Sequence, residues 1–261
     1  MEKIEYWKKL DNLKSYEDLK WNIPEQKSGT ISLIGGNLQN FSSIIRTAEF
    51  IQKTFPIAKL NIVLPDSLKS KLPPLPDVIF TKSTESGSFA KSDELNDTLE
   101  RIDFAILLGD LSKNSATEVA VAEAIKNSDT RILLTRDGID LILTEMGEII
   151  ERDGLFILAS MAQLQKLFRA VYYPKMLLLS MPLMPVVETL HKFTLSYKTT
   201  ILTFHQEQII VANNGNIVTV PIAATDYTPL SLWNGTLASK ISIMNLYNPG
   251  KEIDATLSAI N

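Results

Sequence analysis

Cysteine is absent from this 261-residue sequence, and histidine occurs only twice. Without cysteine the chain has no disulfide bond, no thiolate nucleophile and no cysteine–zinc site. The absence also suits a reducing compartment, so we expect a cytoplasmic protein. Two histidines, His191 and His205, are too few for a histidine metal cluster, and we predict no metal site.

Excess positive charge and a long uncharged apolar run are absent as well. The 26 lysines and arginines are outnumbered by 30 acidic residues, which gives a net charge of −4 and a pI near 5.4. Nucleic acid is therefore not an expected partner. The N-terminal residues "MEKIEYWKKLDNLKSYEDL" lack the apolar core of a secretory signal. The most apolar window, 171–187, contains Lys175 and three prolines, which favours a buried core segment over a membrane span.

The composition that is present, with 45% hydrophobic and 21% charged residues, predicts a folded chain. Short apolar runs alternate with helix-like patterns at 44–51 and 119–125, and this alternation predicts an α/β fold with a central, mainly parallel sheet and helices on both faces. We expect a polar N-terminal extension at 1–28 and a single domain at 29–261. The strand candidates are 30–34, 60–64, 77–81, 103–108, 131–135 and 155–159.

The last third of the sequence has a different rhythm. An apolar helical stripe at 183–190 precedes "TTILTFHQEQIIVANNGNIVTVPIA" (199–223), which has the pattern of three strands joined by tight turns. Asparagine and glycine at 213–216 tolerate the positive φ angles of a hairpin turn, so we expect an antiparallel edge. A helix over 230–247 and a short final helix should follow.

Near the first strand, "TISLIGGNLQNFSS" (30–43) leads from paired glycines into a helical pattern. Such a junction can bring backbone amides close to a phosphate or carbonyl group. Glycine is also the default residue at a sharp turn, so turn geometry alone is an equally open explanation for Gly35 and Gly36.

The order of these elements, with "LIGG", "LPDSL", "DFAILLGDLSKNSATEVAVAEAI" and "GNIVTVP" at their junctions, resembles the ribokinase-like superfamily over residues 20–247. Within it, the sequence is most similar to the ADP/ATP-dependent NAD(P)H-hydrate dehydratase family. This resemblance implies a single ribokinase-like domain with a cleft at the carboxyl ends of the strands. It also implies ADP or ATP with magnesium as cofactor, a nucleotide or small metabolite as partner, and a homo-oligomer.

Several site motifs of that family are eroded. Its Gly-Thr-Gly-Asp turn, whose amides form an anion hole and whose aspartate is the catalytic base, corresponds to Leu232, Trp233, Asn234 and Gly235. No carboxylate lies between 226 and 252 to replace that base. Three other motifs correspond to "GDLSK" (109–113), "ASMAQ" (159–163) and "TFHQEQ" (203–208), and among the family glycines of these motifs only Gly109 is kept.

Other positions keep the family pattern in part. In "LLTRDGIDLI" (133–142), Asp137 corresponds to a family aspartate and Asp140 to an asparagine. Asp137 could face the cleft or simply cap a helix, whereas we expect Asp140 on a solvated face. Trp233 could be a core residue or could block the phosphate site. The resemblance thus assigns ligand binding to Gly35, Gly36, Asn37, Gly109, Asp137, Asn234 and Gly235.

The remaining titratable candidates have ordinary structural explanations. We expect His205 to be exposed in a hairpin turn, His191 to lie at the surface, and Glu145, Glu148 and Glu151 to form a solvated turn.

Three functions stay open from the sequence. The first is a degenerate dehydratase homologue without dehydratase activity that retains weak nucleotide or metabolite binding. The second is an active lyase or related enzyme with a relocated base, for which Asp137 and Asp226 are the candidates. The third is a structural or regulatory subunit of an oligomer.

Overall fold

The structure of this chain is a computed structural model that describes residues 5–16, 22–73 and 77–261. Its centre is a ten-stranded sheet. Seven neighbouring strands of this sheet, from β8 to β4 in the spatial order given next, run parallel to one another, as the sequence predicts. In spatial order the strands are β1 (Trp7–Lys9), β10 (Asn216–Pro221), β9 (Gln208–Asn213), β8 (Thr199–His205), β7 (Leu155–Leu158), β6 (Arg131–Thr135), β5 (Phe104–Gly109), β2 (Ser28–Gly35), β3 (Ile57–Pro65) and β4 (Val78–Thr81).

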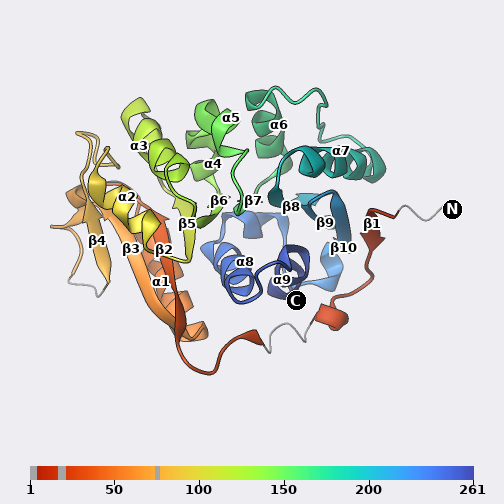
Figure 1. The fold of residues 1–261 in the computed structure, drawn as a ribbon, viewed down its shortest axis with the longest axis horizontal. Coiled ribbons are helices and arrows are strands. Elements are labelled where there is room, and N and C mark those ends of the chain that lie inside the picture. Colours follow the sequence, from red (N-terminus) through yellow and green to blue (C-terminus); the bar gives the residue numbers. More distant parts are fainter. Residues whose placement is uncertain (1–4, 17–21, 74–76) are drawn as a thin grey trace.

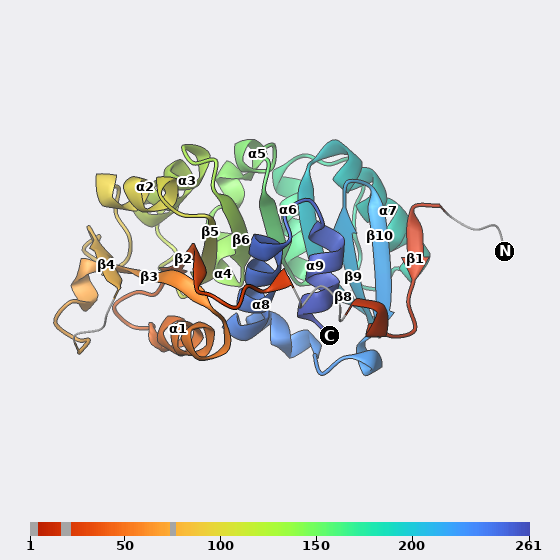
Figure 2. The same ribbon diagram turned by 60° about the horizontal axis from the view of Figure 1, so that its bottom comes forward.

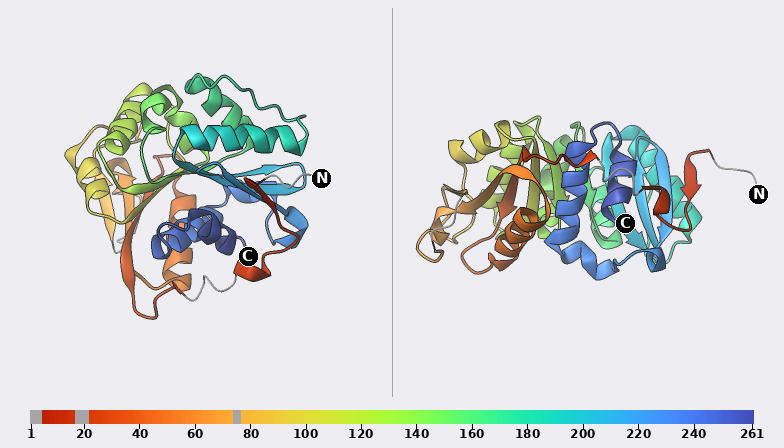
Figure 3. Two further views of the ribbon diagram at one scale, coloured as in Figure 1. Left: turned by 45° about the vertical axis from the view of Figure 1, so that its right-hand side comes forward. Right: turned by 90° about the horizontal axis from the view of Figure 1, so that it is seen from below.

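Helices cover both faces of the sheet (Figure 1; Figure 3, left), which confirms the predicted α/β class. One face carries α2 (Asp93–Glu100), α3 (Ser115–Lys126), α4 (Asp137–Leu141), α5 (Met146–Ile149), α6 (Met161–Ala170) and α7 (Leu183–Ser196). The other carries α1 (Ser42–Thr54), α8 (Gly235–Tyr247) and α9 (Glu252–Ala259). Short 3₁₀ helices are η2 (Asp66–Leu68), η3 (Leu143–Glu145), η4 (Ile222–Ala224) and η5 (Pro229–Trp233).

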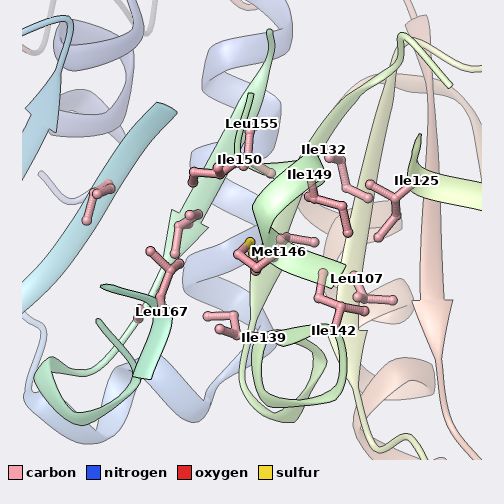
Figure 4. Packing of buried hydrophobic residues seen from close by; sticks show 14 of the residues in the cluster. Leu107, Ile125, Ile132, Ile139, Ile142, Met146, Ile149, Ile150, Leu155 and Leu167 are labelled. Carbon is pink, nitrogen blue, oxygen red and sulfur yellow. The ribbon is translucent and has the colours of Figure 1, made fainter. Parts of the chain in front are cut away.

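Two apolar clusters form the core, one on each face of the sheet. The central strands are buried on both sides, so β5 consists of buried residues throughout and its sequence is continuously apolar instead of alternating. Figure 4 shows part of the first cluster, in which Leu107 and Ile132 from the sheet pack with Ile125 of α3 and Met146 of α5. Burial on this scale is the main favourable term in folding such a chain.

The antiparallel edge predicted for 199–220 is confirmed for β9 and β10, while β8 itself pairs in parallel with β7. Asn214 and Gly215 occupy the turn between β9 and β10 with φ values of 45° and 75°, the positive values that a tight hairpin requires. Residues expected to form an N-terminal extension add β1 beside β10 (Figure 2), and Leu13 and Tyr16 enter the second cluster. The predicted 230–247 helix begins at residue 235, after η5.

The prediction that 171–187 is a buried core segment is wrong for much of that window. Leu177 is buried, but Tyr172 is 93% exposed and Leu179 is 64% exposed. Prolines at 174 and 182 prevent a regular helix there, so residues 171–182 form a loop between α6 and α7. Within the residues that the structure describes, no helix has the length and apolar character to cross a membrane.

Candidate functional site

Strands β2 and β5 approach each other closely at their carboxyl ends. Gly35 pairs with Gly109 at a register irregularity, and the Gly36 amide donates to the Gly109 carbonyl at 2.9 Å. A Cβ atom on Gly35 would lie 2.4 Å from that carbonyl oxygen. Backbone packing therefore requires glycine at position 35 whether or not a ligand binds.

Asp137 links β6 to the loop after β5. Its two carboxylate oxygens accept the backbone amides of Asp110 at 2.9 Å and Leu111 at 3.1 Å. A Cβ atom on Gly109, whose φ is 102°, would lie 2.1 Å from the Asp137 Oδ1 atom, so the carboxylate explains this glycine too. Asn37 completes the contact by donating to the Asp110 carbonyl at 2.6 Å.

A largely buried ion pair that the sequence analysis did not identify lies at this edge. The Arg136 Nη2 atom is 2.7 Å from the Asp110 Oδ1 atom, and the two side chains are only 15% and 16% exposed. The Ser43 hydroxyl of α1 donates to Asp110 and accepts from Arg136. Each charged residue directly follows a buried strand, in "LLGD" and "LLTR", and that placement was the available signal.

The backbone of both residues of this ion pair has a left-handed conformation. Asp110 and Arg136 have φ values of 58° and 54°, which non-glycine residues rarely adopt. The Arg136 Nε atom is also buried without a hydrogen-bond partner. Positive φ angles of this kind each cost about 1–3 kcal/mol and concentrate at functional sites.

Helix α6 supports the pair from behind. Buried Gln163 donates to the Arg136 carbonyl at 2.6 Å and to the Asp140 carboxylate at 3.1 Å. Asp140 also forms an ion pair with Lys166 at 2.5 Å and is 17% exposed, so the expectation of a solvated Asp140 is wrong. The local reason is that α4 begins directly at the strand end and faces α6.

The start of α8 lies at the same edge, because the Thr135 hydroxyl at the end of β6 donates to the Leu232 carbonyl at 3.4 Å. Asn234 caps the helix by accepting the Thr236 amide at 2.9 Å. A Cβ atom on Gly235 would lie 2.0 Å from the Thr47 Oγ1 atom of α1. Position 235 therefore has no space for a carboxylate side chain.

Leu232 and Trp233, the two hydrophobic residues before α8, differ in solvent exposure. Leu232 is buried at 5% exposure, whereas Trp233 is 51% exposed, so a core role for Trp233 is excluded. Crowding at the helix start thus comes from Thr47 and Leu232.

The other titratable candidates lie outside this network. His205 is buried, with Nε2 2.7 Å from the Met181 carbonyl oxygen, so its predicted exposure is wrong. His191 is partly buried and stacks on Tyr6 with ring centroids 3.7 Å apart. Asp226 is exposed and makes no hydrogen bond or ion pair with the described part of the chain.

The acidic residues of η3 and α5 form ion pairs. Lys126 lies 2.5 Å from Glu145 and 2.9 Å from Glu148, and hydrogen bonds from these carboxylates raise the pKa of Lys126. Across 5–16, 22–73 and 77–261, no group of three or more histidine, aspartate or glutamate side chains could hold a metal ion.

Known proteins resemble this chain in three-dimensional structure and not in sequence. No model of a known protein family matches the sequence, and no curated protein matches it. A ribokinase-like superfamily protein from Enterococcus faecalis aligns with a TM-score of 0.68 and 13% identity, over 99% of this chain and 86% of that one.

Two enzymes from Bacillus subtilis are also similar in structure. The ADP/ATP-dependent NAD(P)H-hydrate dehydratase, co-crystallised with ATP and Mg²⁺ and soaked with CoA, gives a TM-score of 0.60 at 16% identity, over 94% of this chain and 84% of its own. Pyridoxal kinase in complex with ADP gives 0.51 at 9% identity, over 90% and 89%. At these identities the likeness establishes architecture, and this chain has the ribokinase-like fold.

Proposed function

We propose that this chain is a degenerate relative of NAD(P)H-hydrate dehydratase that lacks dehydratase activity and whose ligand edge is closed by its own side chains. The observation that carries this proposal is the pairing of Asp137 with the amides of Asp110 and Leu111. Those amides lie at the carboxyl edge of a parallel sheet, where proteins of this architecture bind ligands.

The lack of a free carboxylate at position 235 and at Asp137 supports loss of the chemistry. General-base catalysis requires a proton acceptor within hydrogen-bond reach of the reacting group. Gly235 has no side chain and no space for one, and both carboxylate oxygens of Asp137 already accept amide protons.

Electrostatics also disfavours a nucleotide at this edge. The positive charge of Arg136 is neutralised by Asp110, and Asp137 adds a further negative charge beside the same loop. A phosphate group that approached the amides of Asp110 and Leu111 would therefore meet the Asp137 carboxylate, which already accepts both of them. These residues do not fit ADP or ATP with magnesium, since the amides of Asp110 and Leu111 are already paired with Asp137 and the described chain has no carboxylate cluster for the cation.

The test measures chemistry and binding in the same preparations. We expect no ATP- or ADP-dependent repair of hydrated NADH, against the ~1–1,000 s⁻¹ of ordinary enzymes. In isothermal titration with Mg-ATP or Mg-ADP, the wild type should bind with a dissociation constant weaker than about 1 mM.

Two variants with the same change in charge distinguish an effect at the proposed site from a general effect of surface charge. Asp110→Asn frees the Arg136 guanidinium and should tighten nucleotide binding by at least about tenfold. Asp153→Asn, at a carboxylate that is 78% exposed and distant in the fold, should leave binding unchanged. Efficient repair by the wild type would contradict the proposal, and would favour the relocated base if Asp226→Ala abolished it.

A further inference from the structure

The loop between α6 and α7 exposes an unusual number of apolar side chains. Of nine large hydrophobic residues exposed in the described chain, five lie between positions 172 and 184. The loop runs along the outside of the molecule (Figure 1). We name this surface the α6–α7 face and define it by Tyr172, Met176, Leu178, Leu179 and Met184.

Tyr172 is the most informative residue of this face. Helix α6 ends in a Schellman motif, in which the Tyr172 amide donates to the Arg169 carbonyl at 3.1 Å and the Tyr173 amide to the Phe168 carbonyl at 2.8 Å. The residue after the helix end must be left-handed, and glycine usually occupies it. Here tyrosine occupies it with a φ of 53°.

This tyrosine gains nothing inside one copy of the chain. Its side chain is 93% exposed, while the neighbouring Tyr173 packs in T-shaped contact with Phe168 and Phe193. A strained backbone that holds a large aromatic side chain in water is unfavourable for folding alone. An exposed tyrosine among exposed apolar side chains is, however, typical of interface hot spots.

From these features we propose that the α6–α7 face binds a second copy of this chain in a two-fold dimer. At roughly 200 Å² for each fully exposed large side chain, the five residues expose about 600 Å². One side of a standard interface covers about 800 Å², of which about 65% is apolar in homodimers. The face therefore has the area and the apolar share that a homodimer needs.

The charges around the face suit self-association. Arg169 on α6 and Lys175 in the loop form no ion pair with described residues, while Glu188 on α7 is exposed and paired only with Lys192. Lys175 also acts electrostatically on Glu188 within one copy, so the border of the face carries charges of both signs, as the polar rim of a protein interface does. A lipid surface would favour a cluster of four or more cations without an acidic residue.

The face also has a hollow beside its projecting side chains. A cavity of about 30 Å³ lies between α6 and the loop, and its lining combines apolar residues such as Phe168 and Leu177 with the polar side chains of Gln165, Arg169 and Lys175. A hollow of this size has room for only about one or two water molecules, so the exposed side chains of the face and not this cavity would provide the contact.

Sedimentation velocity at increasing protein concentration tests the proposal. We expect the wild type to dimerise below about 100 µM, and Tyr172→Gly and Leu179→Lys each to weaken the dimer at least about tenfold. Tyr172→Gly also relieves the left-handed backbone, so its melting temperature at a concentration where the wild type is monomeric should not fall. The control Leu230→Lys changes a leucine that is 77% exposed outside the face and should leave dimerisation intact.

Three results would overturn this assignment. One is a wild type that stays monomeric throughout the concentration range. Another is a dimer that persists unchanged in both face variants, which would place the interface elsewhere. The third is a monomer that co-sediments with phosphatidylcholine–phosphatidylglycerol vesicles and loses that binding in Tyr172→Gly, which would assign the face to lipid. None of these outcomes depends on whether the carboxyl edge binds nucleotide.

Discussion

Two regions of this molecule satisfy their chemical groups in opposite ways. At the carboxyl edge of β5 and β6, the amides of the 110–111 loop and the Arg136 guanidinium are paired with carboxylates of the same chain. On the α6–α7 face, large apolar side chains such as Tyr172 and Leu179 meet solvent. The groups at the edge where the sequence resemblance places the ligand site are thus paired within the chain, whereas the α6–α7 face, which the resemblance does not involve, exposes apolar side chains to solvent.

The difference concerns where binding free energy is available. A ligand at the carboxyl edge must first displace hydrogen bonds and an ion pair that already exist, so it gains only the difference between old and new contacts. A partner on the α6–α7 face displaces only water from apolar surface. Substitutions should therefore destabilise the monomer at the edge and leave it nearly unchanged on the face.

The largest expected effect is at Asp137. Asp137→Ala removes the acceptor of two loop amides and should destabilise the fold by about 3 kcal/mol, since each unsatisfied amide costs about 1–3 kcal/mol. Urea unfolding measures this loss, and the surface control Asp153→Ala should change stability by less than about 0.5 kcal/mol. If Asp137→Ala unfolds at the wild-type urea concentration, water satisfies the amides and the edge is not closed.

Next in size is the packing of α8 on α1. Gly235→Ala places a Cβ atom against Thr47 and should cost about 2 kcal/mol through overpacking. Thr47→Ala removes the clashing hydroxyl, so the double variant should recover part of that loss in a double-mutant cycle. Gly147→Ala is the control, because its Cβ would meet no atom within 4 Å, and helix propensity should make it neutral or stabilising. Purely additive losses would show that the 235–47 contact does not limit position 235.

The sequence was sufficient to predict the architecture, because burial on both faces of a parallel sheet leaves a strong local pattern. "FAILLG" in β5 is apolar throughout, and the asparagine–glycine turn at 213–216 fixes its hairpin through φ preferences. The prediction that 171–187 is buried is wrong because the hydrophobicity of a side chain indicates only which environment it favours. It does not measure whether neighbouring elements are placed to cover it.

The site residues predicted from the sequence include several that meet at one edge of the sheet, but their contacts were not predicted. Gly35, Gly109 and Asp137 lie together as expected. Contacts within the chain, however, explain why positions 35 and 109 are glycine. Arg136 and Asp110 are 26 positions apart and meet only because β5 and β6 are adjacent. Pairings of this kind depend on strand order, which local sequence patterns do not contain.

On the α6–α7 face we expect a small gain in monomer stability. Tyr172→Gly relaxes a left-handed residue whose side chain has no packing role, and should stabilise the monomer by about 1 kcal/mol. Tyr172→Ala removes the same ring but keeps the strain, so it should stabilise less. Thermal unfolding of dilute protein compares the two, and a destabilised Tyr172→Gly would mean that the ring contributes to folding within one copy.

The smallest expected effect concerns the ion pair between Glu188 and Lys192 on α7, beside the same face. The hydrogen bond from Lys192 lowers the pKa of Glu188 in the folded chain, and both side chains are half exposed. A carboxyl group whose pKa is lower in the folded state contributes stability above its unfolded pKa and loses that contribution as the pH falls through the folded pKa. The gap in melting temperature between wild type and Glu188→Gln should therefore be small near about pH 7 and disappear near about pH 3. Asp137→Asn, measured in parallel, should show the larger gap at neutral pH, because its partners are amides inside the chain and not an exposed lysine. A Glu188→Gln gap that equals the Asp137→Asn gap, or that persists in acid, would show that the face is as internally satisfied as the edge.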